Sequence, residues 1–131
     1  MNWDKRGQES VHLLIMSSAQ VTSARALGTR LSYDDLIRHV TRAVDTPTTG
    51  FSVVYGVSDN DRAPVDNAKA SHLGFRPQDN AEVFAAQILA DAPRPDPTDP
   101  AQTCHGGAFA AVGLGQSGKA QMNIVDDTKT A

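Results

Sequence analysis

The stretch LSYDDLIRHVTRAVDTP (residues 31–47) decides the fold, because it is the clearest helix in the sequence and it separates two strand-like segments. Ser32 suits the N-cap position, and Asp35 follows three residues later, close to a capping box. Pro47 and Gly50 close the element. Apolar residues recur with a helical period and predict one apolar face, made of Leu36, Ile37, Val40, Ala43 and Val44.

The segments on either side of this helix are typical of strands. SVHLLIM (10–16) is a short apolar run whose two faces are both largely apolar, as in a parallel strand covered on both sides. FSVVYGVS (51–58) is rich in β-branched and aromatic residues. A strand, a helix and a second strand in this order predict a parallel α/β arrangement. Two strands alone would leave both edges of the sheet open, so we expect further strands to complete it.

The rest of the chain is less regular. Small polar residues over 17–31 predict a long loop, a kind of segment that is often functional. A short helix is expected over 67–73, and a last helix is expected after Asp79 or Asn80. Four prolines within 92–100 predict an extended segment. We therefore expect an α/β fold with two short parallel strands, helices and an irregular C-terminal tail, ordered over 1–110 and disordered over 111–131.

Composition excludes several classes of protein. The chain has 131 residues, a formal net charge of −3 and scattered Lys and Arg residues, so it has no basic stripe for nucleic acid. No segment approaches the ~20 apolar residues of a membrane span. The single Cys104 cannot form an internal disulfide, and no secretion pattern opens the chain. We expect a cytoplasmic protein that needs neither membrane nor nucleic acid.

The first residues resemble the end of an element rather than a beginning. WDKRGQES (3–10) reads as the last turn of a helix followed by the entry to a strand. Gly7 suits the left-handed position just past a helix end. We therefore expect that the sheet and the helix to which these residues belong are completed by sequence upstream of residue 1.

Five segments together resemble one family. WDKRGQES, LSYDDLIRHVTRAVDTP, VVYGVSDN, the pair Asp66-Asn67 and HLGFRPQDNAEVF occur in the order and at the spacing found in extended short-chain dehydrogenases/reductases, the NAD-dependent epimerase/dehydratase family. PDPTDP followed by GGAF is similar to the uronate dehydrogenase branch of that family. The resemblance covers residues 3–110, and the ordered series is more specific than any single motif.

The resemblance implies a function and a cofactor. Members of that branch have a Rossmann domain and a smaller C-terminal substrate region, and they oxidise the anomeric carbon of hexuronic acids with NAD. This chain would be the C-terminal part of such an oxidoreductase. The family's catalytic Tyr, followed four residues later by Lys, has no counterpart here, because neither Tyr33 nor Tyr55 has a Lys at that spacing. We therefore expect no catalytic residue in this chain, no activity from it alone and no tight binding of NAD.

A glycine-rich string near the C-terminus does not change that expectation. GLGQSG (113–118) matches G-x-G-x-x-G as a string. A nucleotide-binding turn needs a strand before it and a crossover helix after it, and this polar stretch predicts neither.

Two residues are candidates for a substrate site, both by resemblance. Ser17 occupies the place after the first strand where the family has a Gly-Ser pair, so it is a candidate for hydrogen bonding to substrate or cofactor. Arg25 fits the position of the family's carboxylate-binding Arg, and a guanidinium suits a carboxylate because it can bind it bidentately. The alternative for Arg25 is an ordinary solvated loop charge. Leu14 and Met16 depart from the family's Arg and Gly.

Other polar residues have simpler interpretations. Asp34 and Asp35 lie in the first helical turn, where capping and compensation of the helix dipole are expected rather than acid–base chemistry. Asp66 is expected to cap a helix, although the pair Asp66-Asn67 matches the family. No metal site is expected. The remaining candidates are expected to be structural: His12 in a strand, His72 in a packed short helix, and the pair Cys104-His105, which is too few ligands for zinc.

Two other functions stay open from the sequence. The chain could work as a half-enzyme that docks onto a separate Rossmann half, or form a homo-oligomer, through its exposed apolar strand faces. It could instead be a small non-catalytic binding or interaction protein that has kept part of the fold. The departures at Leu14, Met16 and Val65 separate these alternatives, because drift at these positions would indicate that catalysis was abandoned.

Overall fold

The computed structural model describes residues 9–18, 20–94 and 96–116, so the predicted helix end before residue 9 lies outside the described residues. Two compact units are present, one ending at Ala92 and one beginning at Pro93. The elements of the first unit, in chain order, are β1 (Ser10–Ile15), β2 (Ser17–Ser18), α1 (Ala26–Thr29), β3 (Arg30–Leu31), α2 (Tyr33–Asp45), β4 (Phe51–Gly56), the 3₁₀ helices η2 (Ala68–Leu73) and η3 (Ala81–Phe84), and α3 (Ala85–Asp91).

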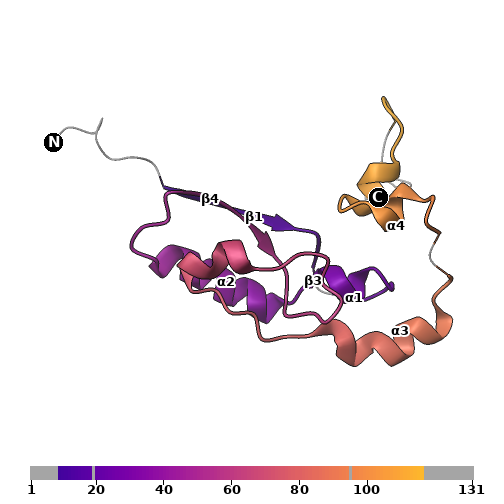
Figure 1. The fold of residues 1–131 in the computed structure, drawn as a ribbon, viewed down its shortest axis with the longest axis horizontal. Coiled ribbons are helices and arrows are strands. Elements are labelled where there is room, and N and C mark those ends of the chain that lie inside the picture. The colour runs from indigo at the N-terminus through magenta and orange to yellow at the C-terminus, as the bar shows by residue number, and fades with distance from the viewer. Residues whose placement is uncertain (1–8, 19, 95, 117–131) are drawn as a thin grey trace, which may run out of the picture. The chain divides into compact units, whose positions relative to one another are not determined.

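The predicted parallel strand pair is confirmed. β1 and β4 pair in parallel from Ser10 opposite Phe51 to Ile15 opposite Gly56, and Figure 1 shows the two arrows side by side. β4 is slightly shorter than the predicted strand 51–58, because the chain turns away after Gly56. Both strands run in the same direction, so their carboxyl ends meet at one edge of the sheet.

One face of this strand pair carries the main core. Val54 of β4 packs with Ala70, Leu73 and Phe75, and partly buried Val11 and Leu13 of β1 complete the cluster. The predicted helix stop after 73 is confirmed, since Gly74 has φ +71°, a left-handed conformation that favours glycine. The other face of the strand pair is exposed within the described residues, with Leu14 46% and Val53 44% exposed, in line with the expectation that the strand pair presents exposed apolar faces.

The segment predicted as a long loop, 17–31, is instead built from short elements. β2 pairs in parallel with β3, setting Ser17 opposite Arg30 and Ser18 opposite Leu31, and α1 lies between them in the chain. A second core cluster forms here from Leu27, Ala81 and Ala85, with Val21 and Ile88 packed against it. These contacts join α1 to η3 and α3, so partners distant in sequence order this segment.

Helix α2 begins as predicted but buries a different face. The hydroxyl of Ser32 accepts a hydrogen bond from the backbone N–H of Asp35 at 3.0 Å, which confirms the cap. The fully buried residues of α2 are Asp35 and His39. The predicted apolar face lies largely in solvent, with three prominent residues 46% exposed or more: Ile37, Val40 and Val44.

The last helix and the second unit complete the described chain. Asn80 caps η3 by accepting from the N–H of Glu82 at 2.9 Å, which confirms one of the two predicted caps. In the second unit, α4 (Pro100–Thr103) and the 3₁₀ helix η4 (Gly107–Ala111) follow the proline-rich stretch. A helix therefore begins at the last residue of the stretch predicted as extended, because Asp99 caps it and proline fits its first turn.

Candidate functional site

The candidate site lies where the strands of the first unit end. Ser17 follows β1 after one intervening residue, Met16, and Ser58 and Asn60 follow the end of β4. In open parallel sheets, ligands bind outside the carboxyl ends of the strands. The pairing of β2 with β3 also brings Ser17 opposite Arg30, and the chain reaches Arg30 directly from Arg25 through α1.

Arg25 occupies the first position of a tightly closed turn. Its carbonyl oxygen accepts hydrogen bonds from the N–H groups of Gly28 at 3.1 Å and Thr29 at 3.3 Å, and from the Thr29 hydroxyl at 3.2 Å. Leu27, fully buried, anchors the same turn in the second core cluster. The Arg25 side chain is half-buried. We name residues 25–29 the Arg25 turn.

Asn60 joins the Arg25 turn to the end of β4. Its side-chain amide nitrogen donates to the carbonyl oxygens of Gly28 at 3.2 Å and Arg30 at 2.8 Å, and its amide oxygen accepts from the N–H of Ala81 at 2.9 Å. The residue is only 7% exposed. The backbone N–H of Ser58 also donates to the Arg30 oxygen, at 2.9 Å. Groups that follow a distant strand therefore hold the end of the turn, at Gly28, and the residue just after it, Arg30.

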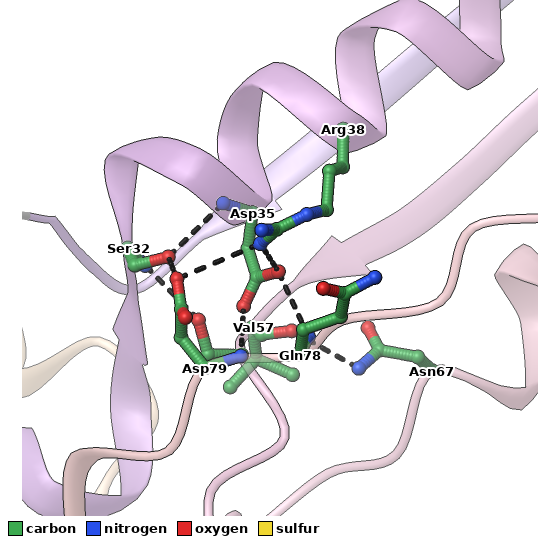
Figure 2. Close-up of polar contacts among 8 residues, drawn as sticks. Ser32, Asp35, Arg38, Val57, Asn67, Gln78 and Asp79 are labelled. Carbon is green, nitrogen blue, oxygen red and sulfur yellow. Dashed lines mark hydrogen bonds and ion pairs between the residues drawn. The ribbon is translucent and has the colours of Figure 1, made fainter.

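A second polar network fixes the start of α2, as Figure 2 shows. The Asp35 carboxylate is fully buried and accepts from the N–H groups of Gln78 at 2.9 Å and Asp79 at 3.0 Å. Arg38 forms an ion pair with Asp35 at 2.7 Å. The Ser32 hydroxyl donates to the Asp79 carboxylate, and the Ser32 N–H donates to the Ser58 hydroxyl at 3.0 Å.

The electrostatics of this network keep Asp35 ionised. Burial raises the pKa of a carboxyl group, but hydrogen bonds from the Ser58 hydroxyl, from two backbone N–H groups and from Arg38 outweigh that effect and hold the pKa of Asp35 below its usual value. The first of the two predicted helix-start aspartates, Asp34, is exposed. Asp35 does more than compensate the helix dipole, because it ties α2 to the loop at 78–79.

An open cavity of about 640 Å³ lies beside the start of α2, but its chemistry does not suit a sugar-acid carboxylate. Asp34 and Asp79 both line it and would repel an anion. The guanidinium of Arg30, which also lines it, lies 5.3 Å from the ring centroid of Phe84 in a cation–π contact. Arg25 does not line this cavity.

The other candidates take structural positions. Asp66 lies one residue before the N-cap position of η2, which is Asn67, and accepts from the N–H of Ala68 at 2.9 Å; Asn67 donates to the Val57 carbonyl oxygen at 3.0 Å. His72 is exposed rather than packed, and hydrogen-bonds to the Ser52 hydroxyl at 3.0 Å. His12 is exposed at the strand surface and hydrogen-bonds to Ser10 at 2.7 Å.

The described residues contain neither a metal-binding cluster nor a helix that could span a membrane. Cys104 is exposed and belongs, with His105, to the second unit. Within residues 9–18, 20–94 and 96–116, no group of three or more His, Cys, Asp or Glu side chains is placed to hold a metal ion. None of the helices in the same ranges has the length and hydrophobicity of a membrane span.

The described residues do not fit a dinucleotide. Of the GLGQSG string, Gly113–Gln116 are described and follow the 3₁₀ helix η4 rather than a strand, while 117 and 118 lie outside the described residues. After β1 and β4 the chain enters β2 and an irregular loop, so neither described strand leads into a glycine-rich turn and helix. The residues shown here contain no pyrophosphate cradle.

Sequence reasoning missed Ser58, Asn60 and Asp79 as parts of the site. A polar residue just past the end of a predicted parallel strand is a usable signal, and Ser58 and Asn60 carry it. Nothing in the sequence shows that Asn60 reaches Gly28 and Arg30, because that contact depends on tertiary packing.

Known proteins resemble this chain over most of its length, although no family model matches it. It is 44% identical over 112 residues to a uronate dehydrogenase of Pseudomonas putida, across 85% of this chain and 41% of the relative. It is 37% identical over 110 residues to a uronate dehydrogenase of Agrobacterium fabrum, across 83% of this chain and 42% of that protein.

Solved structures agree with this likeness. A mutant uronate dehydrogenase from Agrobacterium tumefaciens complexed with NAD matches with a TM-score of 0.77 and 34% identity, across 88% of this chain and 44% of that one. A glucuronic acid dehydrogenase from Chromohalobacter salexigens matches with a TM-score of 0.75 and 40% identity, across 80% and 40%. The chain spans about two fifths of the length of these relatives. In sequence and in α/β fold, the chain is uronate dehydrogenase-like and is similar to the C-terminal part of these Rossmann-type relatives.

Proposed function

We propose that this chain supplies the substrate-binding part of an NAD-dependent oxidoreductase that oxidises a hexuronic acid at its anomeric carbon. One observation carries the proposal: the Arg25 turn is rigidly closed beside the carboxyl ends of the strands, in a chain that is uronate dehydrogenase-like. A guanidinium carried on this closed backbone turn suits a planar carboxylate, the group that distinguishes a uronic acid from a neutral sugar.

Each candidate residue has a distinct role in this proposal. Arg25 binds the uronate carboxylate, and the Ser17 hydroxyl hydrogen-bonds to the sugar or to the cofactor. A bound NAD would supply the hydride acceptor for this oxidation. Because the described residues form no cradle for NAD, their contribution is binding and orientation of the sugar acid. In this proposal the base and the nucleotide site are supplied by sequence corresponding to the portion of the relatives that this chain does not span.

The same proposal includes a partner. The exposed residues Leu14 of β1 and Phe51 and Val53 of β4 lie on one face of the strand pair, next to strand edges that have no pairing partner among the described residues. A Rossmann half that continues the parallel sheet would cover both at once, so we propose docking to such a half in preference to a homo-oligomer. The cytoplasmic location expected from the sequence stays a prediction.

Substitution of Arg25 tests the proposal. The test enzyme combines this chain with the portion of the Pseudomonas putida uronate dehydrogenase that this chain does not span. We expect this assembled enzyme to oxidise uronates. In that enzyme Arg25→Ala should raise the KM for glucuronate or galacturonate by about 10- to 100-fold, because one charge-assisted bidentate contact is lost. The KM for NAD should stay unchanged, since Arg25 is proposed to contact only the sugar acid.

The matched control is Arg76→Ala, which removes the same charge from an exposed residue of the same unit. It should leave both KM values as they are. An unchanged uronate KM in Arg25→Ala would remove Arg25 from the substrate site and leave the proposal without its main support.

A further inference from the structure

The contacts of Asn60 use both donors and one acceptor position of its side-chain amide. Its two amide hydrogens serve the carbonyl oxygens of Gly28 and Arg30, and its oxygen serves the N–H of Ala81. An Asn amide supplies two donors and an acceptor from one short side chain, and no other residue of that size does so. The position is buried, so water does not replace a lost partner.

These contacts converge on the part of the chain that carries Arg25. The N–H of Gly28 donates to the Arg25 carbonyl oxygen and closes the turn, and the carbonyl oxygen of the same residue accepts from Asn60. Asn60 therefore binds the residue that closes the Arg25 turn. Ala81, which donates to the Asn60 oxygen, belongs to the core cluster that contains Leu27 of the turn. Asn60 therefore connects the turn, the end of β4 and the start of η3 through a single amide group.

The packing around Gly28 adds an independent constraint. A Cβ atom at this position would meet the Arg62 carbonyl oxygen well inside contact distance, so the turn and the loop after β4 touch backbone to backbone. Arg62 is itself held by a bidentate ion pair with Glu82, with N–O distances of 2.7 and 2.8 Å. The loop that carries Asn60 therefore meets the turn both through the Asn60 amide and through the Arg62 backbone.

We propose that Asn60 is a positioning residue that holds the Arg25 turn in register with the end of β4, and thereby sets the affinity of the site for a sugar-acid carboxylate. Its effect on affinity rests on the function proposed above, whereas its grip on the turn is a property of this chain alone. Asn60 acts through the backbone of the turn and has no contact with the substrate.

The isosteric variant Asn60→Asp tests, in this chain alone, whether Asn60 holds the Arg25 turn. A carboxylate of the same size would face the Gly28 and Arg30 carbonyl oxygens without a hydrogen to donate, so the turn should loosen. We expect hydrogen exchange of the Gly28 and Thr29 amides, both bonded to the Arg25 oxygen, to accelerate by about tenfold or more. The amides of Ala70 and Gly74 in and after η2 should exchange at their original rates.

The matched control is Asn67→Asp, the same substitution at an Asn that also donates to a backbone oxygen past β4, that of Val57. It should accelerate exchange at Ala70 and Gly74 and leave Gly28 and Thr29 unchanged. The inference is overturned if Asn60→Asp leaves exchange at Gly28 and Thr29 unchanged, or if both variants affect both regions equally. If Asn60→Asp prevents folding, Asn60→Ser, which keeps one donor without the charge, is measured in its place.

The assembled enzyme then separates this inference from the proposed function. Asn60→Asp should raise the uronate KM by about tenfold while kcat and the KM for NAD stay within about twofold, and Asn67→Asp should change none of them. If Arg25→Ala has no effect on the uronate KM, the proposed function fails, and the exchange experiment still decides whether Asn60 holds the turn. If Arg25→Ala raises that KM and Asn60→Asp does not, Asn60 does not position the site.

Discussion

The buried carboxylate of Asp35 connects helix α2 to a distant loop through hydrogen bonds rather than apolar contacts. It is fully buried on α2, yet all of its partners are donors: two backbone N–H groups, an Arg38 guanidinium and a hydroxyl. A buried charge is tolerated only when it is satisfied in this way. The residue therefore holds the loop at 78–79 against the first turn of α2.

Replacing Asp35 should destabilise the chain, and the neighbouring aspartate provides the control. Asp35→Asn keeps the size of the side chain but offers one acceptor oxygen to two backbone donors, so we expect a loss of about 1–3 kcal/mol in the free energy of unfolding. Asp34→Asn, at an exposed position of the same turn, should change it by less than about 0.5 kcal/mol. Urea unfolding measures both, and equal effects would contradict the role of the buried network.

The same carboxyl group should make stability depend on acid pH. The pKa of Asp35 is lower in the folded state than in the unfolded state. Its contribution to the free energy of unfolding is therefore complete above the unfolded pKa of about 4, and it is lost as the pH falls through the folded pKa. The urea concentration at the unfolding midpoint should therefore decrease when the pH is lowered below about 4. Asp35→Asn should flatten that part of the profile, and an unchanged slope would assign the acid dependence to other carboxylates.

His39 should add a separate pH dependence nearer neutrality. Its ring is fully buried against Phe75 at a centroid distance of 4.0 Å, and neither ring nitrogen has a well-aligned hydrogen-bond partner among the described residues. Burial lowers the pKa of His39, and nearby backbone groups of His39 and Tyr55 oppose this only in part. The folded state thus favours the neutral ring.

Because the pKa of His39 is lowered in the folded state, the neutral ring contributes fully to the free energy of unfolding above the unfolded pKa of about 6.5. That contribution declines as the pH falls below this pKa. We expect the free energy of unfolding to decrease between about pH 7 and pH 5. His39→Leu should remove that decrease, as measured by urea unfolding at several pH values. His72→Leu, at an exposed position, should retain it, and a decrease that persists in His39→Leu would contradict the assignment.

At the scale of elements, the sequence predicted those features that depend on neighbouring residues. The cap at Ser32, the glycine stop at Gly74 and both strands of the parallel pair are local signals, and all are present. The organisation of 17–31 and the contacts of Asn60 depend on segments that are distant along the chain, so no periodicity or motif could indicate them. Ser17 and Arg25 entered as site candidates by resemblance alone and stay predictions.

The orientation of α2 marks the same limit. Periodicity locates an apolar face but does not say whether this chain covers it, and here the helix meets its unit through Asp35 and His39 instead. We expect Val44→Lys, at a residue 77% exposed, to change the free energy of unfolding by less than about 0.5 kcal/mol. Val54→Ala, in the main core, should cost about 1–3 kcal/mol. A large loss in Val44→Lys would show that the face is covered in solution.

At the scale of the whole molecule, two facts belong together. The chain spans about two fifths of its relatives, and its described strand pair keeps one apolar face and its outer edges exposed. The Arg25 turn is nevertheless closed and hydrogen-bonded within the chain. The geometry of the turn proposed to bind the sugar acid therefore does not depend on the portion of the relatives that this chain does not span.

The isolated chain should accordingly show no turnover. Mixed with NAD and either galacturonate or glucuronate, it should produce no NADH absorbance above that of a sample without protein, because the described residues contain no nucleotide cradle. The assembled enzyme described above serves as the positive control. Robust turnover by the chain alone would show that it provides the hydride-transfer groups itself.

The close approach of Gly28 to the Arg62 carbonyl has a consequence for mutational tolerance. In a library that randomises each position, 28 should accept glycine alone among functional clones, although the residue carries no side chain that chemistry could use. The requirement is one of space, shared between two stretches of backbone. A position can therefore be intolerant of change because of the atoms it omits.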